Sequence, residues 1–256
     1  MKKTFLLLTL GLGLFTAGLQ AQNDKVKDKV KDKNKDNASW TSDNNGRPKI
    51  EGSGNMVTKD ISVQPFDQID VGGVFSVILS QGGEGVKIEA DDNLQEYFEV
   101  KNDGSKLVIT MKKDNNYQSK KKLKVYISFK NLKSMDLKVV GNVSNEQSLN
   151  FSDLKISNKS VGEISLKLTT QSIDIDNKSV GEIKLSGKAD NATIKNKSVG
   201  DIDAKTFVVQ KMDIDNDGVG EAEVNVEKEL IVKDSFLGKV TNKGSATAKR
   251  TKKASI

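Results

Sequence analysis

The residues best suited to chemistry are acids that recur in the second half of the chain. They stand 19 or 20 residues apart, at Glu163, Glu182, Asp201 and Glu221. A column of lysines precedes them by four residues, at Lys159, Lys178 and Lys197. Glycosidases use a pair of carboxylates, but a catalytic pair would interrupt a repeat, whereas these acids extend one. We therefore predict no catalytic residues, and we expect the two columns to offset each other's charge along a solvent-exposed face.

A second candidate is the segment 213–218, whose sequence Asp-Ile-Asp-Asn-Asp-Gly resembles the start of a calcium-binding loop. An EF-hand loop requires a bidentate Glu at its twelfth position, and this chain has Val224 there. In the equivalent stretch 174–179, Lys178 stands where Asp217 does. The residues before the loop alternate like a strand rather than a helix. We interpret the acids as outward-facing strand and turn residues, and we predict no metal site and no cofactor.

The composition removes several other kinds of chemistry. The 256 residues include no Cys and no His, which excludes disulfides, thiolate metal sites and Ser-His-Asp catalysis. The net charge of +6 comes from the two ends of the sequence. Residues 22–37 contain six Lys and four Asp, and residues 249–256 contain four Lys or Arg. Because the body between these ends is slightly acidic, we expect no nucleic-acid partner.

The first 21 residues have the pattern of an export signal. Lys2 and Lys3 precede an uncharged apolar run from residue 5 to residue 19, and Ala21 is followed by a sharply polar stretch. This order is typical of a cleaved secretory signal peptide, and the run is shorter than the roughly 20 residues of a membrane-spanning helix. We predict an exported protein, in the periplasm, at the cell surface or outside the cell, with no membrane span after signal removal.

Three further segments differ in composition. Residues 22–55 are rich in Lys and Asp, and we predict a disordered linker there because the segment has few apolar residues to bury. From residue 56 to 245 the sequence alternates like short strands, with a helical turn at 94–98. The clearest expected strands before the repeats are 86–90, 107–111 and 123–129. Residues 246–256 form a basic tail.

Internal repeats are the strongest evidence for the fold. The motif Asn-Lys-Ser-Val-Gly-Glu-Ile occupies 158–164, and it recurs at 177–183 and, with Asp for Glu, at 196–202. Weaker copies follow at 216–222 and 234–240. A period near 19 with short alternating strands predicts an all-β fold, a parallel β-helix or solenoid with coils of about 19 residues. A leucine-rich repeat has a similar period, but it requires a helix and a Leu-x-x-Leu-x-Leu pattern that this sequence lacks.

The repeat also predicts three inward-pointing apolar ladders. The first contains Leu154, Ile156, Ile173, Ile175, Ile194, Met212, Ile214, Leu230 and Val232. The second contains Val161, Val180, Val199, Val219 and Leu237, and the third contains Ile164, Ile183, Ile202, Ala222 and Val240. A column of asparagines should stack at a turn and form hydrogen bonds between coils, and asparagine also tolerates left-handed backbone there. The column contains Asn158, Asn177, Asn196 and Asn216. The glycine after each valine should allow positive φ.

Several stretches of the sequence resemble a known family. Phe-Asp-Gln-Ile-Asp-Val at 66–71 and the stretch 74–82 resemble its opening strands, and the likeness continues in Ala-Asp-Asp-Asn-Leu at 90–94 and in the strand 107–109. Together with the glycine-bearing coils, about residues 60–245 resemble the putative auto-transporter adhesin head domain, the head GIN or DUF2807 type of exported Bacteroidetes proteins. The resemblance implies a β-helical fold, an exported location and no catalytic motif.

The sequence as a whole favours binding over catalysis. We expect an exported, non-catalytic β-solenoid that acts as a surface adhesion or interaction module, with a glycan or a protein as partner. A β-helical carbohydrate-active enzyme and a periplasmic scaffold protein stay open as alternatives, and so does a homo-oligomer. An enzyme needs one cleft with perturbed acids, whereas an adhesin needs only a broad face. Because residues 241–256 are polar and basic, we expect this chain by itself not to be a complete autotransporter.

Overall fold

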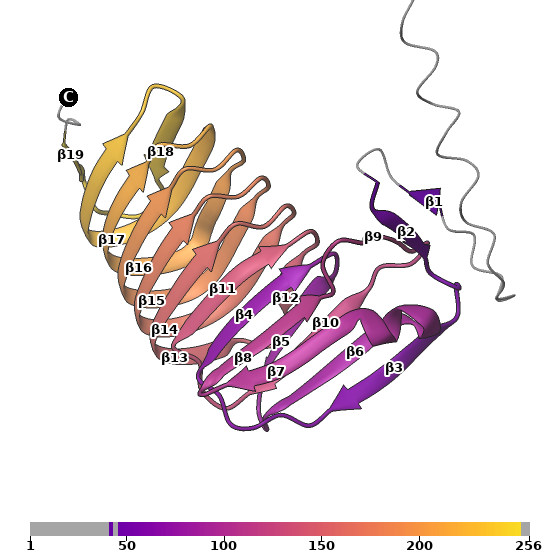
Figure 1. Ribbon diagram of the computed structural model, residues 1–256. Coiled ribbons are helices and arrows are strands. Elements are labelled where there is room, and N and C mark those ends of the chain that lie inside the picture. Colours follow the sequence, from indigo (N-terminus) through magenta and orange to yellow (C-terminus); the bar gives the residue numbers. More distant parts are fainter. Residues whose placement is uncertain (1–40, 43–45, 252–256) are drawn as a thin grey trace, which may run out of the picture. The chain divides into compact units, whose positions relative to one another are not determined.

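The structure is a computed structural model that describes residues 41–42 and 46–251. The predicted signal peptide and most of the predicted linker lie outside these residues, as does the end of the basic tail, 252–256. In Figure 1 the orange and yellow strands of the second half are stacked in sequence order, whereas strands of the first half are interleaved, with β11 between β4 and β13.

The described residues form short strands first and long strands later. The strands before the repeats are β1 (Thr41–Ser42), β2 (Pro48–Glu51), β3 (Met56–Ile61), β4 (Gln68–Gly73), β5 (Ser76–Gln81), β6 (Gly85–Asp91), β7 (Phe98–Asp103), β8 (Lys106–Met111), β9 (Asn116–Gln118), β10 (Lys124–Phe129), β11 (Ser134–Val139) and β12 (Val143–Asn145). The later strands are β13 (Leu149–Asn158), β14 (Ile164–Asn177), β15 (Ile183–Asn196), β16 (Ile202–Asn216), β17 (Gly220–Asp234), β18 (Gly238–Asn242) and β19 (Ala248–Arg250). A 3-10 helix, η1 (Asp92–Tyr97), supplies the predicted helical turn. No helix of the described residues has the length and hydropathy needed to cross a membrane.

Parallel pairing between successive coils confirms the predicted solenoid. Strands β13 to β17 lie side by side in sequence order, and equivalent motif positions face each other, as Asn158 faces Asn177 and Asn177 faces Asn196. The first half of the chain continues the same sheet through parallel pairs such as β11 with β4 and β12 with β5. Antiparallel pairs, β3 with β6 and β7 with β8, lie at its N-terminal end.

Two of the three predicted ladders point inward as expected. In the first, Leu154 pairs with Ile173 and Ile156 with Ile175, and all four side chains are buried. The third ladder is buried along its whole length: Ile164, Ile183, Ile202, Ala222 and Val240. These stacked aliphatic side chains form the core of the solenoid, and their removal from water is the main driving force for stacking the coils.

The second ladder was predicted wrongly, because its valines point outward. The exposed fractions are 49% for Val161, 54% for Val180, 55% for Val199, 48% for Val219 and 61% for Leu237. The serine before each of the first three valines is the buried residue instead: Ser160, Ser179 and Ser198. At this corner of the coil, polar side chains face the interior and apolar side chains face solvent.

The parity of the coil explains the error. In a strand, every second side chain points inward. A coil of 19 residues has an odd number of positions, so this alternation must be interrupted within each coil if equivalent residues are to point the same way in the next coil. In β14 the inward residues are even-numbered from Ile164 to Thr170 and odd-numbered from Ile173 to Asn177. The interruption therefore lies at residues 171–172, within β14. A ladder that turned both the valines and the isoleucines inward would need the interruption at the glycine corner, where the structure alternates without a break.

The buried asparagines form a continuous hydrogen-bonded ladder, as predicted. The Nδ2 of Asn158 donates to Oδ1 of Asn177 at 2.8 Å, Asn177 donates to Asn196 at 2.7 Å, and Asn196 donates to Asn216 at 2.7 Å. All four side chains are buried. The asparagines end strands and do not use the left-handed backbone that this residue type tolerates, since Asp114 is the only residue other than glycine with positive φ among the described residues.

The glycine column has the predicted positive φ, and it also allows a close backbone approach. Gly181 has φ +136°, and Gly200 and Gly220 have φ +138°. A Cβ atom added to Gly181 would overlap the carbonyl oxygen of Gly162 in the preceding coil. Glycine is therefore required at this corner for two reasons, a backbone conformation that L-residues rarely adopt and the distance between coils.

Strands extend beyond both predicted ends of the solenoid. Strand β2, assigned to the linker, pairs with β1 and β9, and its Ile50 is buried. The buried carboxylate of Asp91 connects this region to the sheet, because it accepts hydrogen bonds from the backbone of Gly54 at 2.7 Å and from Ser119 at 2.5 Å. Strand β19, assigned to the basic tail, pairs in parallel with β17. Segments this short have too little alternation to be recognised in a sequence.

Replacing Asn177 by Leu should destabilise the solenoid by about 2–5 kcal/mol, because each buried polar group left without a partner costs about 1–3 kcal/mol. The change removes three hydrogen bonds: Asn177 no longer accepts from the Asn158 amide or from the Ser179 hydroxyl, and it no longer donates to Asn196. The measurement is equilibrium unfolding in urea. The exposed neighbour Lys178 is the matched control, and Lys178→Ser should change stability by no more than about 0.5 kcal/mol. Equal effects of the two changes would contradict the buried ladder.

Replacing Gly181 by Ala should lower stability by at least about 2 kcal/mol, since the new Cβ combines a strained φ with a backbone overlap. Gly83→Ala is the control, because a Cβ there meets no atom within 4 Å. Thermal melting of the two variants measures the difference. If Gly181→Ala melts at the same temperature as the wild type, the coils do not approach each other as closely at this corner as the structure indicates.

Candidate interaction surface

The outward-facing valines form a continuous row along the solenoid. Parallel β-bridges join them one to the next, and we call these five residues the valine ridge: Val140, Val161, Val180, Val199 and Val219. Two exposed apolar residues continue the row. Val74 lies at one end, because the carbonyl of the preceding residue, Gly73, accepts a hydrogen bond from the N–H of Val140 at 2.8 Å. Leu237 lies at the other end, because its carbonyl accepts a hydrogen bond from the N–H of Gly220 at 3.2 Å. At about 4.8 Å per coil, the row is roughly 30 Å long.

The fold fixes where each ridge valine lies but does not require it to be apolar. The corner backbone is satisfied by the neighbouring coils, as the N–H of Val180 donates to Ser160 at 3.1 Å and the N–H of Gly162 donates to Val180 at 2.9 Å. The valine side chain contributes nothing to this pairing and projects about half-exposed from the corner. A contiguous exposed apolar row with no role in the core marks a site of interaction.

Charged residues of opposite sign flank the valine ridge. Two residues before each of three valines lies an exposed lysine, and two residues after it lies an acid. We call these the lysine flank and the acidic flank: Lys159, Lys178 and Lys197, and Glu163, Glu182 and Asp201. The three rows run together along the solenoid because the coils are in register.

The two flanks do not neutralise each other, contrary to the sequence expectation. Glu163 and Glu182 share one cation, Lys184, which lies 3.0 Å from each carboxylate. Lys178 instead contacts Asp176, at 2.9 Å. The two flanks do not pair because the valine lies between them. The nearest opposite charges are Asp176 on the side of the lysine flank and Lys184 on the side of the acidic flank. Lys184 does not follow from the repeat, because the equivalent residue in the preceding coil is Ser165.

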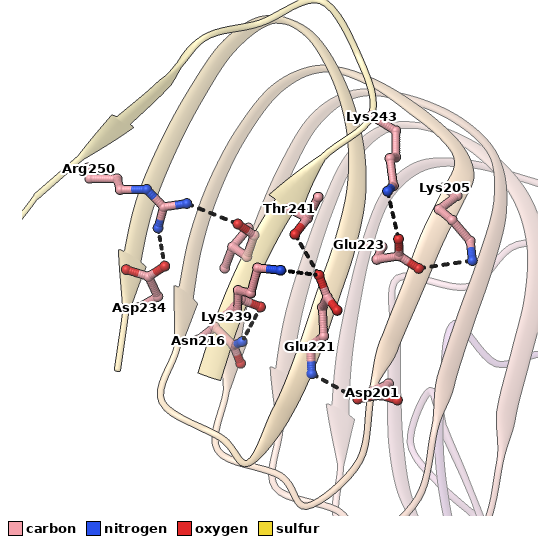
Figure 2. Close-up of polar contacts among 11 residues, drawn as sticks. Asp201, Lys205, Asn216, Glu221, Glu223, Asp234, Lys239, Thr241, Lys243 and Arg250 are labelled. Atoms are coloured by element: carbon pink, nitrogen blue, oxygen red, sulfur yellow. Dashed lines mark hydrogen bonds and ion pairs between the residues drawn. The ribbon is translucent and has the colours of Figure 1, made fainter. Parts of the chain in front are cut away.

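The last coils carry a denser network of ionic contacts, shown in Figure 2. The Glu223 carboxylate lies 2.9 Å from both Lys205 and Lys243, and these two cations hold the pKa of Glu223 below its ordinary value. Glu221 accepts a hydrogen bond from Thr241 at 2.6 Å and pairs with Lys239 at 3.3 Å, contacts that likewise lower its pKa. The acids at this end are therefore held ionised by their neighbours.

The calcium-like segment forms part of a strand rather than a binding loop. Strand β16 continues to Asn216 and pairs in register with β17, so that Asp213 and Asp215 alternate with buried Ile214 and Asn216. Asn216 belongs to the buried ladder. In the part of the chain that the structure describes, no group of three acids is arranged to hold a metal ion.

A groove of about 670 Å³ lies on another part of the coils, beside the start of the repeats. Phe151, which stacks on Phe129 at 6.0 Å between ring centroids, contributes to its wall. Charged residues of both signs, among them Asp153 and Lys155, also line it. Another aromatic, Tyr126, is covered by Lys87 4.5 Å from its ring centre.

Comparison with known sequences identifies the family. Residues 65–246 match the family described as putative auto-transporter adhesin, head GIN domain. The chain belongs to this family. The match covers most of the solenoid, including the coils that carry the valine ridge, and it confirms the resemblance seen in the sequence. No protein with curated functional information matches significantly.

Solved structures with the same fold include proteins named as putative adhesins. A putative adhesin from Bacteroides fragilis is 26% identical, with a TM-score of 0.68 over 79% of this chain and 100% of that chain. A putative lipid-binding protein from Parabacteroides distasonis is 19% identical, with a TM-score of 0.53 over 79% of this chain and 99% of that chain. The second likeness shows a shared fold only.

The contribution of Glu223 to stability should depend on pH. Because its folded pKa lies below the ordinary value of 4.5, the carboxylate stabilises the fold above pH 4.5, and this contribution is lost as the pH falls through the lowered pKa. The difference in melting temperature between wild type and Glu223→Gln should therefore be full near neutral pH and disappear in strong acid. Glu146→Gln, in an exposed loop, is the control. A difference that is independent of pH would contradict the assignment.

Proposed function

We propose that this protein is an exported, non-catalytic interaction module that binds its partner through the valine ridge. The observation that carries the proposal is a row of half-exposed valines on a corner whose backbone needs no apolar side chain. Soluble monomers rarely expose such contiguous apolar surface unless it is used. Membership of a family described as adhesins, and the signal-like N-terminus, support the exported location.

The chemistry of the ridge favours a protein partner over a glycan. Sugar rings bind by stacking on aromatic faces together with polar groups, and the five ridge residues are aliphatic. Aliphatic side chains bordered by charges form the usual pattern of a protein interface, with an apolar centre and a polar rim. The ridge is also linear and rigidly supported, so a partner gains contacts without ordering a loop.

The acids next to the ridge have the properties of structural residues. Glu163 and Glu182 both contact Lys184, and Glu221 contacts Lys239. A catalytic general acid in a glycosidase needs a raised pKa, whereas the contacts of Glu221 lower its pKa. The repetition of these acids in successive coils also differs from a unique catalytic pair. These observations support a binding role rather than the carbohydrate-active alternative.

Replacing Val180 by Asp should weaken partner binding at least about tenfold, because a charge at the centre of an apolar interface is desolvated on binding. The assay is solid-phase binding of the chain without its predicted signal peptide to arrays of extracellular proteins and glycans. Stability should change little, since Val180 is 54% exposed.

Val208→Asp is the matched control, because Val208 is an exposed valine of the same solenoid outside the ridge. Its binding should equal that of the wild type. If the two variants bind every partner equally well while both remain folded, the ridge is not the binding surface and the proposed function is wrong.

A further inference from the structure

The arrangement of charge about the valine ridge identifies its partner. We propose that the ridge is a homodimer interface, in which two copies of this chain pack ridge against ridge with their solenoid axes parallel. This inference rests on the proposed function, since it names the partner of the same surface. It follows from three features of the corner, which are the apolar row, the unbalanced flanks and their order across the row.

Each flank carries charge that the described residues of its own chain do not neutralise. Lys159 and Lys197 form no ion pair with any residue that the structure describes. On the other side, Lys184 is the one cation of the described residues that pairs with Glu163 and Glu182, so within this part of the chain one of the two negative charges is not compensated. A surface of this kind, positive along one edge and negative along the other, is best neutralised by a partner with the same two edges in the opposite order.

Symmetry then selects the orientation. A two-fold axis that runs along the ridge between two facing copies places the lysine flank of each copy opposite the acidic flank of the other. It also keeps the solenoid axes parallel, so each valine faces the same valine of the partner. A two-fold axis across the ridge would make the solenoids antiparallel and place lysines against lysines, which is unfavourable. The surface is thus self-complementary in one orientation, as a closed two-fold dimer requires.

The paired surfaces would extend along the whole apolar row. The apolar row runs over seven coils from Val74 to Leu237, roughly 30 Å, and the charged flanks widen it on both sides. The flank pattern holds in the coils of Val161, Val180 and Val199 and ends in the next coil, where Asp217 replaces the lysine and Glu221 pairs with Lys239. The charge-matched centre is therefore confined to three coils, with apolar contacts continuing on either side.

The first test is the oligomeric state of the chain without its predicted signal peptide, measured by sedimentation velocity over a range of concentrations. The wild type should reversibly form a dimer, Val180→Asp should raise the dissociation constant at least about tenfold, and Val208→Asp should leave it unchanged. A wild type that stays monomeric at all concentrations overturns the proposal, and so does a dimer that Val180→Asp leaves intact.

The second test exchanges charge between the flanks. One variant converts the lysine flank (Lys159→Glu, Lys178→Glu and Lys197→Glu), and the other converts the acidic flank (Glu163→Lys, Glu182→Lys and Asp201→Lys). Each alone should dimerise at least about tenfold more weakly than wild type, because like charges then face each other on both sides. An equimolar mixture should recover the dimer as a heterodimer. Failure of the mixture to associate, with both variants folded by their melting curves, overturns the charge matching.

The third test determines orientation and uses the absence of cysteine from the chain. Single variants Val161→Cys and Val199→Cys are treated separately with a short bismaleimide cross-linker. In the parallel dimer both should cross-link to their own copies with similar yield. In an antiparallel dimer centred on Val180, cross-links would form when the two variants are mixed and not within either one, which would overturn the proposal.

These outcomes separate the dimer from the proposed function. A monomeric wild type whose binding to another protein is abolished by Val180→Asp refutes the dimer and leaves the ridge as a binding surface. If Val180→Asp still forms the dimer and still binds the partner protein, both the dimer and the binding role of the ridge are refuted.

Discussion

Hydrogen-bonded asparagines at the corner of each coil fix how successive coils are aligned. Stacked aliphatic side chains tolerate small displacements, but the Asn158 to Asn216 ladder does not, because each amide is buried and has its partner one coil away. A shift of one residue would leave several buried amides without partners, at a cost of about 1–3 kcal/mol each. The glycines beside the ladder then allow the backbones to approach. Directional hydrogen bonds therefore set the register, and apolar burial supplies most of the stability.

The same corner determines which chemistry faces solvent. Within Asn-Lys-Ser-Val-Gly-Glu-Ile, the inward positions are taken by Asn, Ser and Ile, and the outward positions by Lys, Val and Glu. Alternate residues of one seven-residue motif thus form the core and the surface of the solenoid. Repeating the motif for structural reasons also repeats the surface, which is how a row of valines between rows of opposite charge arises without any dedicated loop. The surface is as regular as the core because both follow the same register.

The sequence supports the fold far better than it supports the site. A period near 19, the inward isoleucines and the asparagine column could all be predicted, because stacking requires the same residue type at the same position in every coil. Val180 could not be placed by hydrophobicity, since an odd-length coil has to break its alternation somewhere, and only the structure shows the break at residues 171–172. Lys184 was missed because it is not part of the repeat, and β2 was missed because one buried residue, Ile50, gives too little periodicity.

The ladder also explains where along the solenoid the ridge is most rigid. At Asn216 the amide chain ends, because the next coil has Asp234 at that position, and Asn216 donates instead to the backbone of Lys239 at 3.3 Å. Beyond it, ion pairs such as those of Glu223 take the place of buried amides, and partly exposed pairs contribute less. Local opening should therefore begin in the last coils, while Val161, Val180 and Val199 stay supported by the complete part of the ladder. A surface held in one conformation before binding loses less entropy on association, so the coils with the most regular motif are also those best suited to form the centre of an interface.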